Sequence, residues 1–237
     1  MPVKVLDSSG AGTYADIVEG IMWATEHGAH VINLGLGGSE PSKALENVIA
    51  YSYNRGVTLI AAVGNDGVGG VCYPAAYDDY VIAVGATRYD ETLAYYSNYG
   101  LSLDLTAPGG DLNVDQNGDG YGDGILQQTY GIDSKISWGY CFMEGTSMAA
   151  AHVSAVAALL IAHGNTASPT EVREALESTA EDKEPTGWDI EYGWGIVDAY
   201  AALQWRATKP GPGPDQDQDL CLLKRSLRQN QQSALGH

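Results

Sequence analysis

Basic residues are scarce in this sequence, which has 12 Lys and Arg against 30 Asp and Glu among 237 residues and a formal net charge of −18. A nucleic-acid-binding face needs Lys and Arg to meet phosphates, so this balance argues against that class and against docking on anionic lipid. No apolar run approaches the ~18–20 residues that span a bilayer. The first six residues, MPVKVL, have neither the apolar core nor the cleavage site of a signal peptide, so we expect none in this chain.

Cysteine is also rare, and the three thiols are too few for a disulfide scaffold or a Cys-rich metal site. They belong to Cys72, Cys141 and Cys221. A single bridge between Cys72 and Cys141 is one interpretation, and two buried free thiols are the other. The sequence leaves both open.

Composition divides the chain into a body and a tail. Residues 209–219 (KPGPGPDQDQD) form a Pro-rich, Gly-rich and acidic linker that has no means of burying apolar surface. We expect residues 220–237, which are short and polar, to be a disordered tail. Only three of the acidic residues but four of the basic ones lie after residue 208, so the acidity belongs to the body. Residues 1–208 are therefore predicted to form the folded domain.

Within the body, short apolar segments alternate with helical patterns. Buried strands are predicted at 3–6, 30–36, 57–63 and 80–86, and helices at 15–27, 41–56, 146–163, 170–179 and 197–205. The 146–163 segment is apolar almost all round, which predicts a helix buried on every side. Strands that alternate with helices indicate an α/β fold with three layers, α/β/α, around a mostly parallel sheet.

Two of the predicted strands run into glycine-rich segments, at 35–38 (GLGG) and 64–67 (GNDG). In open parallel sheets, ligands bind beyond the carboxyl ends of the strands, and glycine lets a ligand approach the backbone closely. Asn65 offers an amide donor at such an end. The alternative is that Asn65 is a turn former within Asn-Asp-Gly.

Ser147 lies at the start of the apolar 146–163 helix. A hydroxyl at a helix N-terminus lies at the positive end of the helix dipole, beside N–H groups without helical partners, which favours an alkoxide and a developing oxyanion. The alternative is that Thr146 or Ser147 is simply an N-cap.

Residues 145–153 (GTSMAAAHV) closely resemble the nucleophile motif of the subtilisin-like serine peptidases. Further motifs follow in that family's order: 3–6 (VKVL), 30–38 (HVINLGLGG), 61–67 (AAVGNDG), 73–74 (YP), 81–86 (VIAVGA), 97–100 (SNYG), 107–109 (APG) and 193–199 (GWGIVDA). The resemblance covers about 3–205. It implies a subtilisin-like fold and a serine endopeptidase that hydrolyses peptide bonds in peptides or proteins, working outside the cell.

The resemblance also assigns roles to individual residues. Ser147 is implied to be the nucleophile that becomes acylated, and Asn65 to be the side-chain donor of the oxyanion hole, together with the backbone N–H of Ser147. The implied substrate-binding residues are Gly35, Leu36, Gly37, Ala62, Val63 and Gly64. The first three would pair with extended substrate backbone by strand addition, and all six would wall the pocket for the residue before the scissile bond.

The family also needs an Asp and then a His before the Ser, and the resemblance begins after the point where both would occur. His27 and His30 match positions that are not catalytic in the family, and His152 matches a structural histidine. Without a base, a serine hydroxyl is a weak nucleophile. We therefore expect a truncated domain with little activity by itself, whose missing N-terminal segment would supply the Asp, the His and central strands of the sheet.

The densest acidic stretch, at 111–123, indicates a structural Ca²⁺ site in an inserted loop of about 109–126. Hard oxygen ligands fall at positions 1, 3, 5, 7 and 9 of an EF-hand-type loop, with Gly120 at position 6. These ligands are Asp115, Asn117, Asp119, the carbonyl of Tyr121, and Asp123. Position 12 is Leu126 rather than Glu, and the alternative is a solvated acidic loop. The resemblance implies a second, weaker cation site at Asp104, with carbonyls near Ala75 and Tyr77.

Two other functions remain as hypotheses. One is a catalytically dead, calcium-binding scaffold of the same fold. The other is an α/β-hydrolase esterase, because residues 145–149 (GTSMA) half-match its nucleophile motif. That fold needs an Asp and then a His after the Ser. Past the 145–153 motif only His163 and His237 remain, and neither follows a suitable Asp-bearing strand, so the sequence disfavours the esterase.

Overall fold

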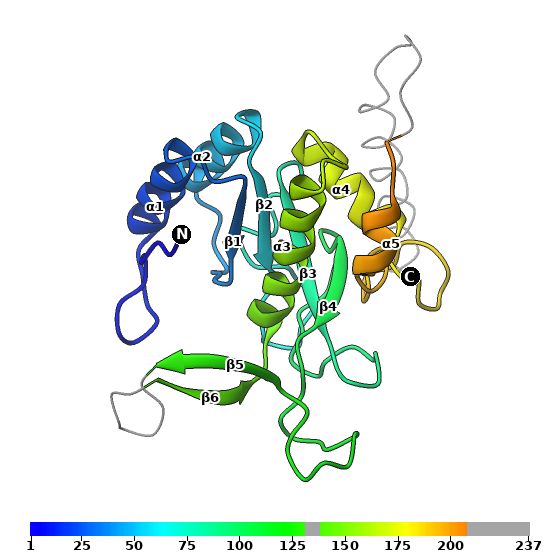
Figure 1. Ribbon diagram of the computed structural model, residues 1–237. Helices are drawn as coiled ribbons and strands as arrows, with labels where there is room; N and C mark the ends of the chain where they lie inside the picture. The colour runs from blue at the N-terminus through cyan, green and yellow to red at the C-terminus, as the bar shows by residue number, and fades with distance from the viewer. Residues whose placement is uncertain (131–137, 208–237) are drawn as a thin grey trace, which may run out of the picture. The chain divides into compact units, whose positions relative to one another are not determined.

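The computed structural model describes residues 1–130 and 138–207 (Figure 1). The chain divides into two compact units, Met1–Arg206 and Ala207–His237, and the first holds all the helices and strands described below. The predicted linker and tail lie outside the described residues. Within those residues, the structure contains no helix with the length and hydrophobicity needed to cross a membrane.

A four-stranded parallel sheet forms the centre of the first unit, with strands in the order β1-β2-β3-β4. The strands are β1 (Val31–Leu34), β2 (Thr58–Ala62), β3 (Val81–Thr87) and β4 (Leu105–Pro108). All of β2 and β3 is buried, as expected for parallel strands covered on both faces. The parallel register brings the carboxyl ends of β1 and β2 to the same edge of the sheet.

Helices cover both faces of this sheet, which confirms the α/β fold (Figure 1). The elements are α1 (Tyr14–Glu26) and α2 (Lys43–Asn54) on one face, and α3 (Thr146–Ala162), α4 (Pro169–Ser178) and α5 (Ala199–Gln204) on the other. Alternation along the strands divides the side chains between two cores. In β2, Leu59 and Ala61 pack toward α1 and α2, whereas Ile60 and Ala62 pack toward α3.

Local sequence signals account for where the helices begin and end. Thr13 caps α1 in a capping box with Asp16, and Ser42 caps α2 through a bond from the Leu45 N–H. Gly28, just after α1, has φ +81°, a conformation that glycine adopts without steric cost. These signals explain why the predicted bounds of both helices lie within two residues of the observed ones at each end.

Two expectations for the sheet and its central helix are wrong. Residues 3–6 form no strand, and Val3 is 36% exposed. Among the described residues, β1 pairs only with β2, so its other edge carries no strand. The helix α3 is not buried on every side, because nothing described covers the stripe that carries Ala151, Ala155 and Leu159, the last of which is 51% exposed.

The sequence also gave no indication of an antiparallel hairpin, β5 (Ile125–Tyr130) and β6 (Trp138–Met143). It lies at the foot of α3, and β6 runs directly into that helix (Figure 1). The first two residues of β5 fall inside the predicted 109–126 insertion, which therefore ends in a strand.

Candidate active site

The first turn of α3 is anchored by a glycine in a conformation that favours glycine. Gly145 is the N-cap, has φ +146° and makes no side-chain cap bond. Its N–H lies 3.1 Å from the Gly109 carbonyl and 2.9 Å from the Tyr96 hydroxyl oxygen, which accepts. Thr146 and Ser147 are the first helical residues, so the alternative in which one of them is merely the N-cap is wrong.

Asn65 contacts this helix terminus directly. Its Oδ1 accepts from the Thr146 N–H and from the Thr146 hydroxyl, both at 2.8 Å. These bonds join residues 81 apart in the sequence, so Asn65 does more than form a local turn. Because Oδ1 is the acceptor in both bonds, the amide nitrogen Nδ2 remains to donate elsewhere. Buried Asn98 holds the same loop, through its Oδ1 at 2.9 Å from the Asp66 N–H.

Ser147 is partly exposed, and its hydroxyl donates to the carbonyl of Gly35 at 3.0 Å. A Cβ at Gly35 would lie 3.2 Å from the Ser147 Cβ, so a side chain there would crowd the hydroxyl. As the second residue of α3, Ser147 has an N–H without an acceptor in the helix's own ladder. The structure thus brings Ser147 to the end of β1, and Asn65 to the same helix terminus from the end of β2.

The predicted substrate-binding residues fall into two groups. Gly35, Leu36 and Gly37 follow β1 and line a pocket of about 430 Å³, which also includes Tyr14 and Tyr73. The side chains of Ala62 and Val63 are buried in the two cores, and Gly64 is partly exposed at φ +111°. Any contact that Ala62 or Val63 makes with a substrate would therefore come from the backbone.

None of the described histidines has Ser147 as a hydrogen-bond partner. The Nδ1 atom of His27 lies 2.8 Å from the Trp23 carbonyl, and the ring of His27 stacks on Trp23. His152 Nδ1 lies 2.9 Å from the Met148 carbonyl on its own helix. The Nδ1 atom of each ring is thus engaged by a carbonyl of its own helix rather than by Ser147.

The acidic loop is organised by its own carboxylates. Asp115 accepts from three backbone N–H groups, including that of Gly120 at 2.9 Å. Asn117 and Asp119 each accept from the N–H two residues on. Asp123 is buried, and its Oδ1 has no hydrogen-bond partner. Across residues 1–130 and 138–207, however, no three carboxylate, imidazole or thiol side chains converge in a way that could hold a metal ion.

Asp104, where the resemblance implies a second, weaker metal-ion site, forms an ion pair with Arg173. The carboxylate is fully buried, lies 2.7 Å from Arg173 Nη1, and accepts from the Ala83 N–H at 2.8 Å. The other guanidinium nitrogen of Arg173 donates to the carbonyls of Asp78 and Val81. Arg173 therefore supplies a positive charge beside Asp104 Oδ1, and the second cation site stays a prediction.

Cys72 and Cys141 are both free thiols, but each is only partly buried, so the second of the two interpretations from the sequence holds for the absence of a bridge and not for full burial. Cys221 lies outside the described residues. Burial and the nearby Asp66 raise the pKa of the Cys72 thiol.

Sequence reasoning missed three residues that position the site, namely Thr146, Tyr96 and Asn98. Tyr96 is buried and bridges the Gly145 N–H to the Gly110 carbonyl, and burial raises its pKa well above the ordinary value. Their bonds connect segments that are far apart in the sequence, so no local pattern could assign them. Two of the three had a signal of another kind, because Asn98 lies within the 97–100 motif and Thr146 within the 145–153 motif.

Comparison with known proteins agrees with this arrangement. The sequence model of the Subtilase family matches residues 1–195. Subtilisin DY of Bacillus licheniformis is 39% identical over 206 residues, which are 85% of this chain and 67% of subtilisin DY. M-protease of Shouchella clausii (strain KSM-K16) is 40% identical over 84% of this chain and 47% of its own length. This chain thus spans between about half and two thirds of such relatives.

Solved structures give the same result. A lanthipeptide protease superposes with a TM-score of 0.74 at 30% identity, over 85% of this chain and 69% of the other. A protease from Pseudoalteromonas arctica PAMC 21717 superposes with a TM-score of 0.75 at 35% identity, over 86% of this chain and 61% of the other. The chain therefore belongs to the subtilase family of subtilisin-like serine peptidases.

Proposed function

We propose that Ser147 is the nucleophile of a serine endopeptidase that hydrolyses peptide bonds through an acyl-enzyme. The observation that carries this proposal is the pair of hydrogen bonds from the Thr146 N–H and hydroxyl to Asn65 Oδ1. These bonds fix the carboxamide beside the helix terminus that presents Ser147. Attack of the Ser147 oxygen on a peptide carbonyl would place the new oxyanion near Asn65 Nδ2 and the Ser147 N–H. Collapse of this intermediate would break the C–N bond and release the amine, which would receive the serine's proton through a base. Water would then hydrolyse the ester, releasing the acid product and restoring the serine hydroxyl.

Substrate would enter along the ends of β1 and β2. The segment Gly35–Gly37 would pair with an extended substrate backbone, and the 430 Å³ pocket beside it would take side chains on the acyl side. The Gly35 carbonyl holds the hydroxyl of Ser147 in the resting state. This hydrogen bond has to break before the hydroxyl can attack, because the hydroxyl must lose its proton and the Gly35 carbonyl is too weak a base to take it.

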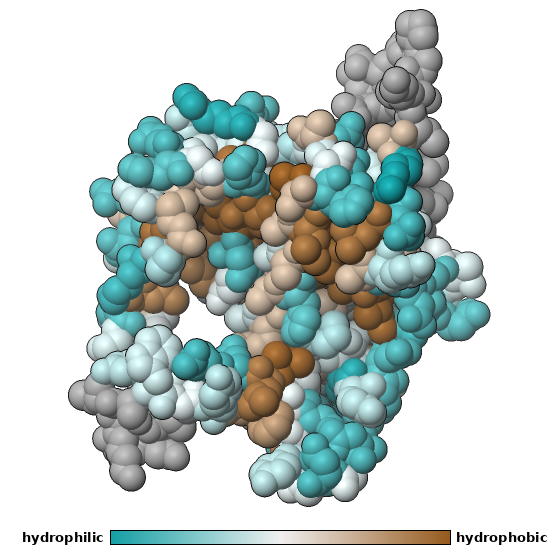
Figure 2. Space-filling view, in the orientation of Figure 1, coloured by the Kyte–Doolittle hydropathy of each residue, from teal (hydrophilic) through white to brown (hydrophobic). Residues whose placement is uncertain are grey.

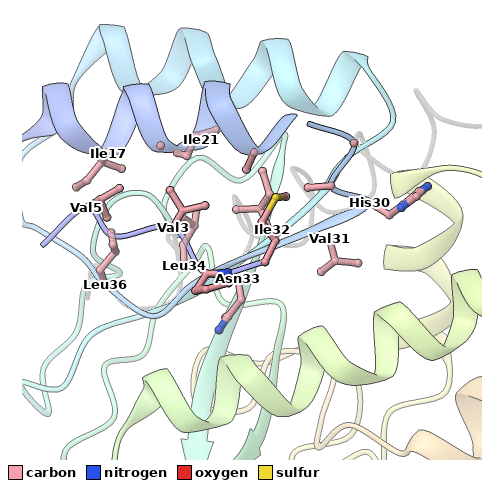
Figure 3. Close-up of a pocket in the computed structure, with 16 residues that line it drawn as sticks. Val3, Val5, Ile17, Ile21, His30, Val31, Ile32, Asn33, Leu34 and Leu36 are labelled. Carbon is pink, nitrogen blue, oxygen red and sulfur yellow. The ribbon is translucent and has the colours of Figure 1, made fainter. Parts of the chain in front are cut away.

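A base is still required, and we propose that a segment carrying the family's Asp and His completes the domain. Three surfaces in the first unit support docking there: the open edge of β1, the exposed stripe of α3, and a cavity of about 580 Å³ beside β1. Figure 3 shows apolar side chains of α1 and β1, among them Ile17 and Ile32, around this cavity. Figure 2 shows apolar surface exposed between the α1–α2 pair and α3.

It follows that the chain by itself is inactive or nearly so. In subtilisin, loss of triad members leaves only about 10³–10⁴-fold acceleration over water. The catalytically dead scaffold stays as the second candidate, because the described histidines whose bonds are known bind elsewhere. We also propose that the full domain works outside the cell, as the resemblance implies.

Complementation tests this proposal. The chain would be refolded alone, and with the N-terminal part of subtilisin DY that it does not match, and assayed with a quenched fluorescent peptide. Hydrolysis is expected only from the mixture, and the Ser147→Ala chain should abolish it. Hydrolysis by the chain alone would contradict its predicted inactivity. A folded complex that stays inactive and resists a fluorophosphonate probe would favour the scaffold.

We further propose that the 109–126 loop binds structural Ca²⁺. Asp115, Asn117 and Asp119 supply hard oxygens on one tight turn, and the unpartnered buried Oδ1 of Asp123 supports a cation nearby. The carbonyl of Tyr121 would complete the set. Because the carboxylates do not converge at present, the loop would have to contract. Calorimetry should detect Ca²⁺ binding that Asp115→Ala removes, and equal heats for the two chains would disprove the site.

A further inference from the structure

The hairpin β5–β6 exposes one face that is largely aromatic. Directly paired residues share a face of an antiparallel ribbon, and the pairs Leu126–Phe142, Gln128–Tyr140 and Tyr130–Trp138 all lie on one side. Trp138, Tyr140 and Tyr130 are 68%, 74% and 54% exposed. The opposite face carries the less exposed Ile125, Gln127 and Thr129 on β5. We call the exposed residues Leu126, Tyr130, Trp138, Tyr140 and Phe142 the aromatic face.

The surroundings of the aromatic face are acidic. Between Arg88 and Arg173, the sequence contains a single Lys or Arg, Lys135. The face is also continuous with the acidic loop, because the Phe142 and Tyr121 rings lie 6.0 Å apart. Glu144, which directly follows β6, accepts from the Tyr95 hydroxyl and the Leu112 N–H. An approaching cation would therefore meet aromatic rings within a negative potential, which is the environment that favours cation–π contacts.

The spacing of the aromatic face also fits an extended chain. Its three rows lie two residues apart along each strand, or about 6.8 Å at the usual rise of an antiparallel strand. Alternate side chains of an extended peptide repeat at the same distance. The Phe142 end of the hairpin leads through Glu144 and Gly145 into α3, so this end of the aromatic face is the one nearest in the sequence to the proposed nucleophile.

We infer that the aromatic face is a docking surface for extended polypeptide substrates that carry Lys or Arg at alternate positions. This inference rests on the proposed peptidase function and adds the substrate class. The aromatic rings would stack on the cationic side chains and their aliphatic stems, and the acidic loop would raise the local concentration of basic segments. Binding should weaken as salt is added, because exposed charges are screened.

Fluorescence anisotropy of a short labelled peptide in which Lys and Ser alternate tests this inference on the full chain. Trp138→Ala/Tyr140→Ala should weaken binding about tenfold, as expected for the loss of two exposed cation–π contacts. Tyr200→Ala, which removes a 77% exposed aromatic from α5, is the matched control and should bind like the wild type. A peptide with Glu in place of Lys should not bind.

Ser147→Ala separates this inference from the proposed function, since it removes the nucleophile but keeps the aromatic face. Its peptide binding should equal that of the wild type even if no preparation hydrolyses peptides. Unchanged binding by a folded double variant, or equal binding of the Glu peptide, would overturn the inference. So would sedimentation showing that the face joins two copies of the chain while peptide binding stays the same.

Discussion

The buried guanidinium of Arg173 offers the sharpest test of how this fold is held together. It donates to Asp104 Oδ1 at 2.7 Å and to the carbonyls of Val81 and Asp78 at 2.7 and 3.1 Å, and it lies 3.6 Å from Glu177. The change Arg173→Met keeps much of the side chain's length but leaves the fully buried Asp104 charge without its cation. Breaking such a pair costs about 3–5 kcal/mol, a large share of the ~5–15 kcal/mol that stabilises a typical domain.

Urea unfolding followed by circular dichroism would measure this loss. The double variant Arg173→Met/Asp104→Asn is the control, because Asn removes the charge while its Oδ1 can still accept from the Ala83 N–H. It should recover part of the lost stability, since Asn leaves no uncompensated charge at position 104, although Glu177 still loses its contact with Arg173. A loss below about 1 kcal/mol in the single variant, or no recovery in the double variant, would refute the reasoning.

Two further predictions concern titratable groups whose pKa is raised in the folded chain. Burial, together with the nearby Asp182, raises the pKa of Asp189, so ionisation of this group costs the folded state stability as the pH rises above the ordinary Asp value. The Asp189→Asn variant should therefore have a higher melting temperature than the wild type at neutral pH. The difference in melting temperature should disappear below the ordinary Asp pKa, and equal melting temperatures at neutral pH would contradict this. The raised thiol pKa of Cys72 should make its alkylation by iodoacetamide slower in the native chain than in the urea-unfolded chain. Peptide mass spectrometry would measure both rates, and equal rates would contradict this prediction.

Periodicity was enough to predict the elements that pack on both sides of the sheet. The positions of Ile17, Ile21 and Ala24 fixed the buried face of α1, and uninterrupted apolar runs marked β2 and β3. The hairpin could not be predicted, because its strands alternate mainly between partly exposed and exposed positions, and residues such as Gln127 and Gln128 carry no apolar signal. These elements depend on their partner strand rather than on a core.

The failures near β1 have a different cause. Residues 3–6 have the composition of a buried strand, and α3 has the composition of a buried helix. Composition indicates which segments are apolar enough to be buried, but not whether another part of the chain covers them. In the described part of the chain, Val3 lies near Gly20 of α1 but is still 36% exposed, and nothing covers the stripe through Ala155 and Leu159.

The sequence proposed Ser147 and Asn65 as site residues but could not predict the hydrogen bonds around them. Ser147 and Asn65 followed from motifs, because each lies in a distinctive local sequence. The contact that joins them passes through Thr146, and no local pattern links residues 65 and 146. The arginine at Asp104 was missed for the same reason, since Arg173 lies 69 residues away on α4.

The role assigned to Asn65 is the central claim, and the rate at which a fluorophosphonate labels Ser147 tests it most directly. The completed domain would be labelled with Asn65 intact and with Asn65→Ala, and the modified peptide identified by mass spectrometry. Loss of one oxyanion donor slows subtilisin itself about 10²–10³-fold, and we predict a slowing of that order, with the label on Ser147 in both chains. Equal labelling rates, or a label on any other residue, would contradict the account.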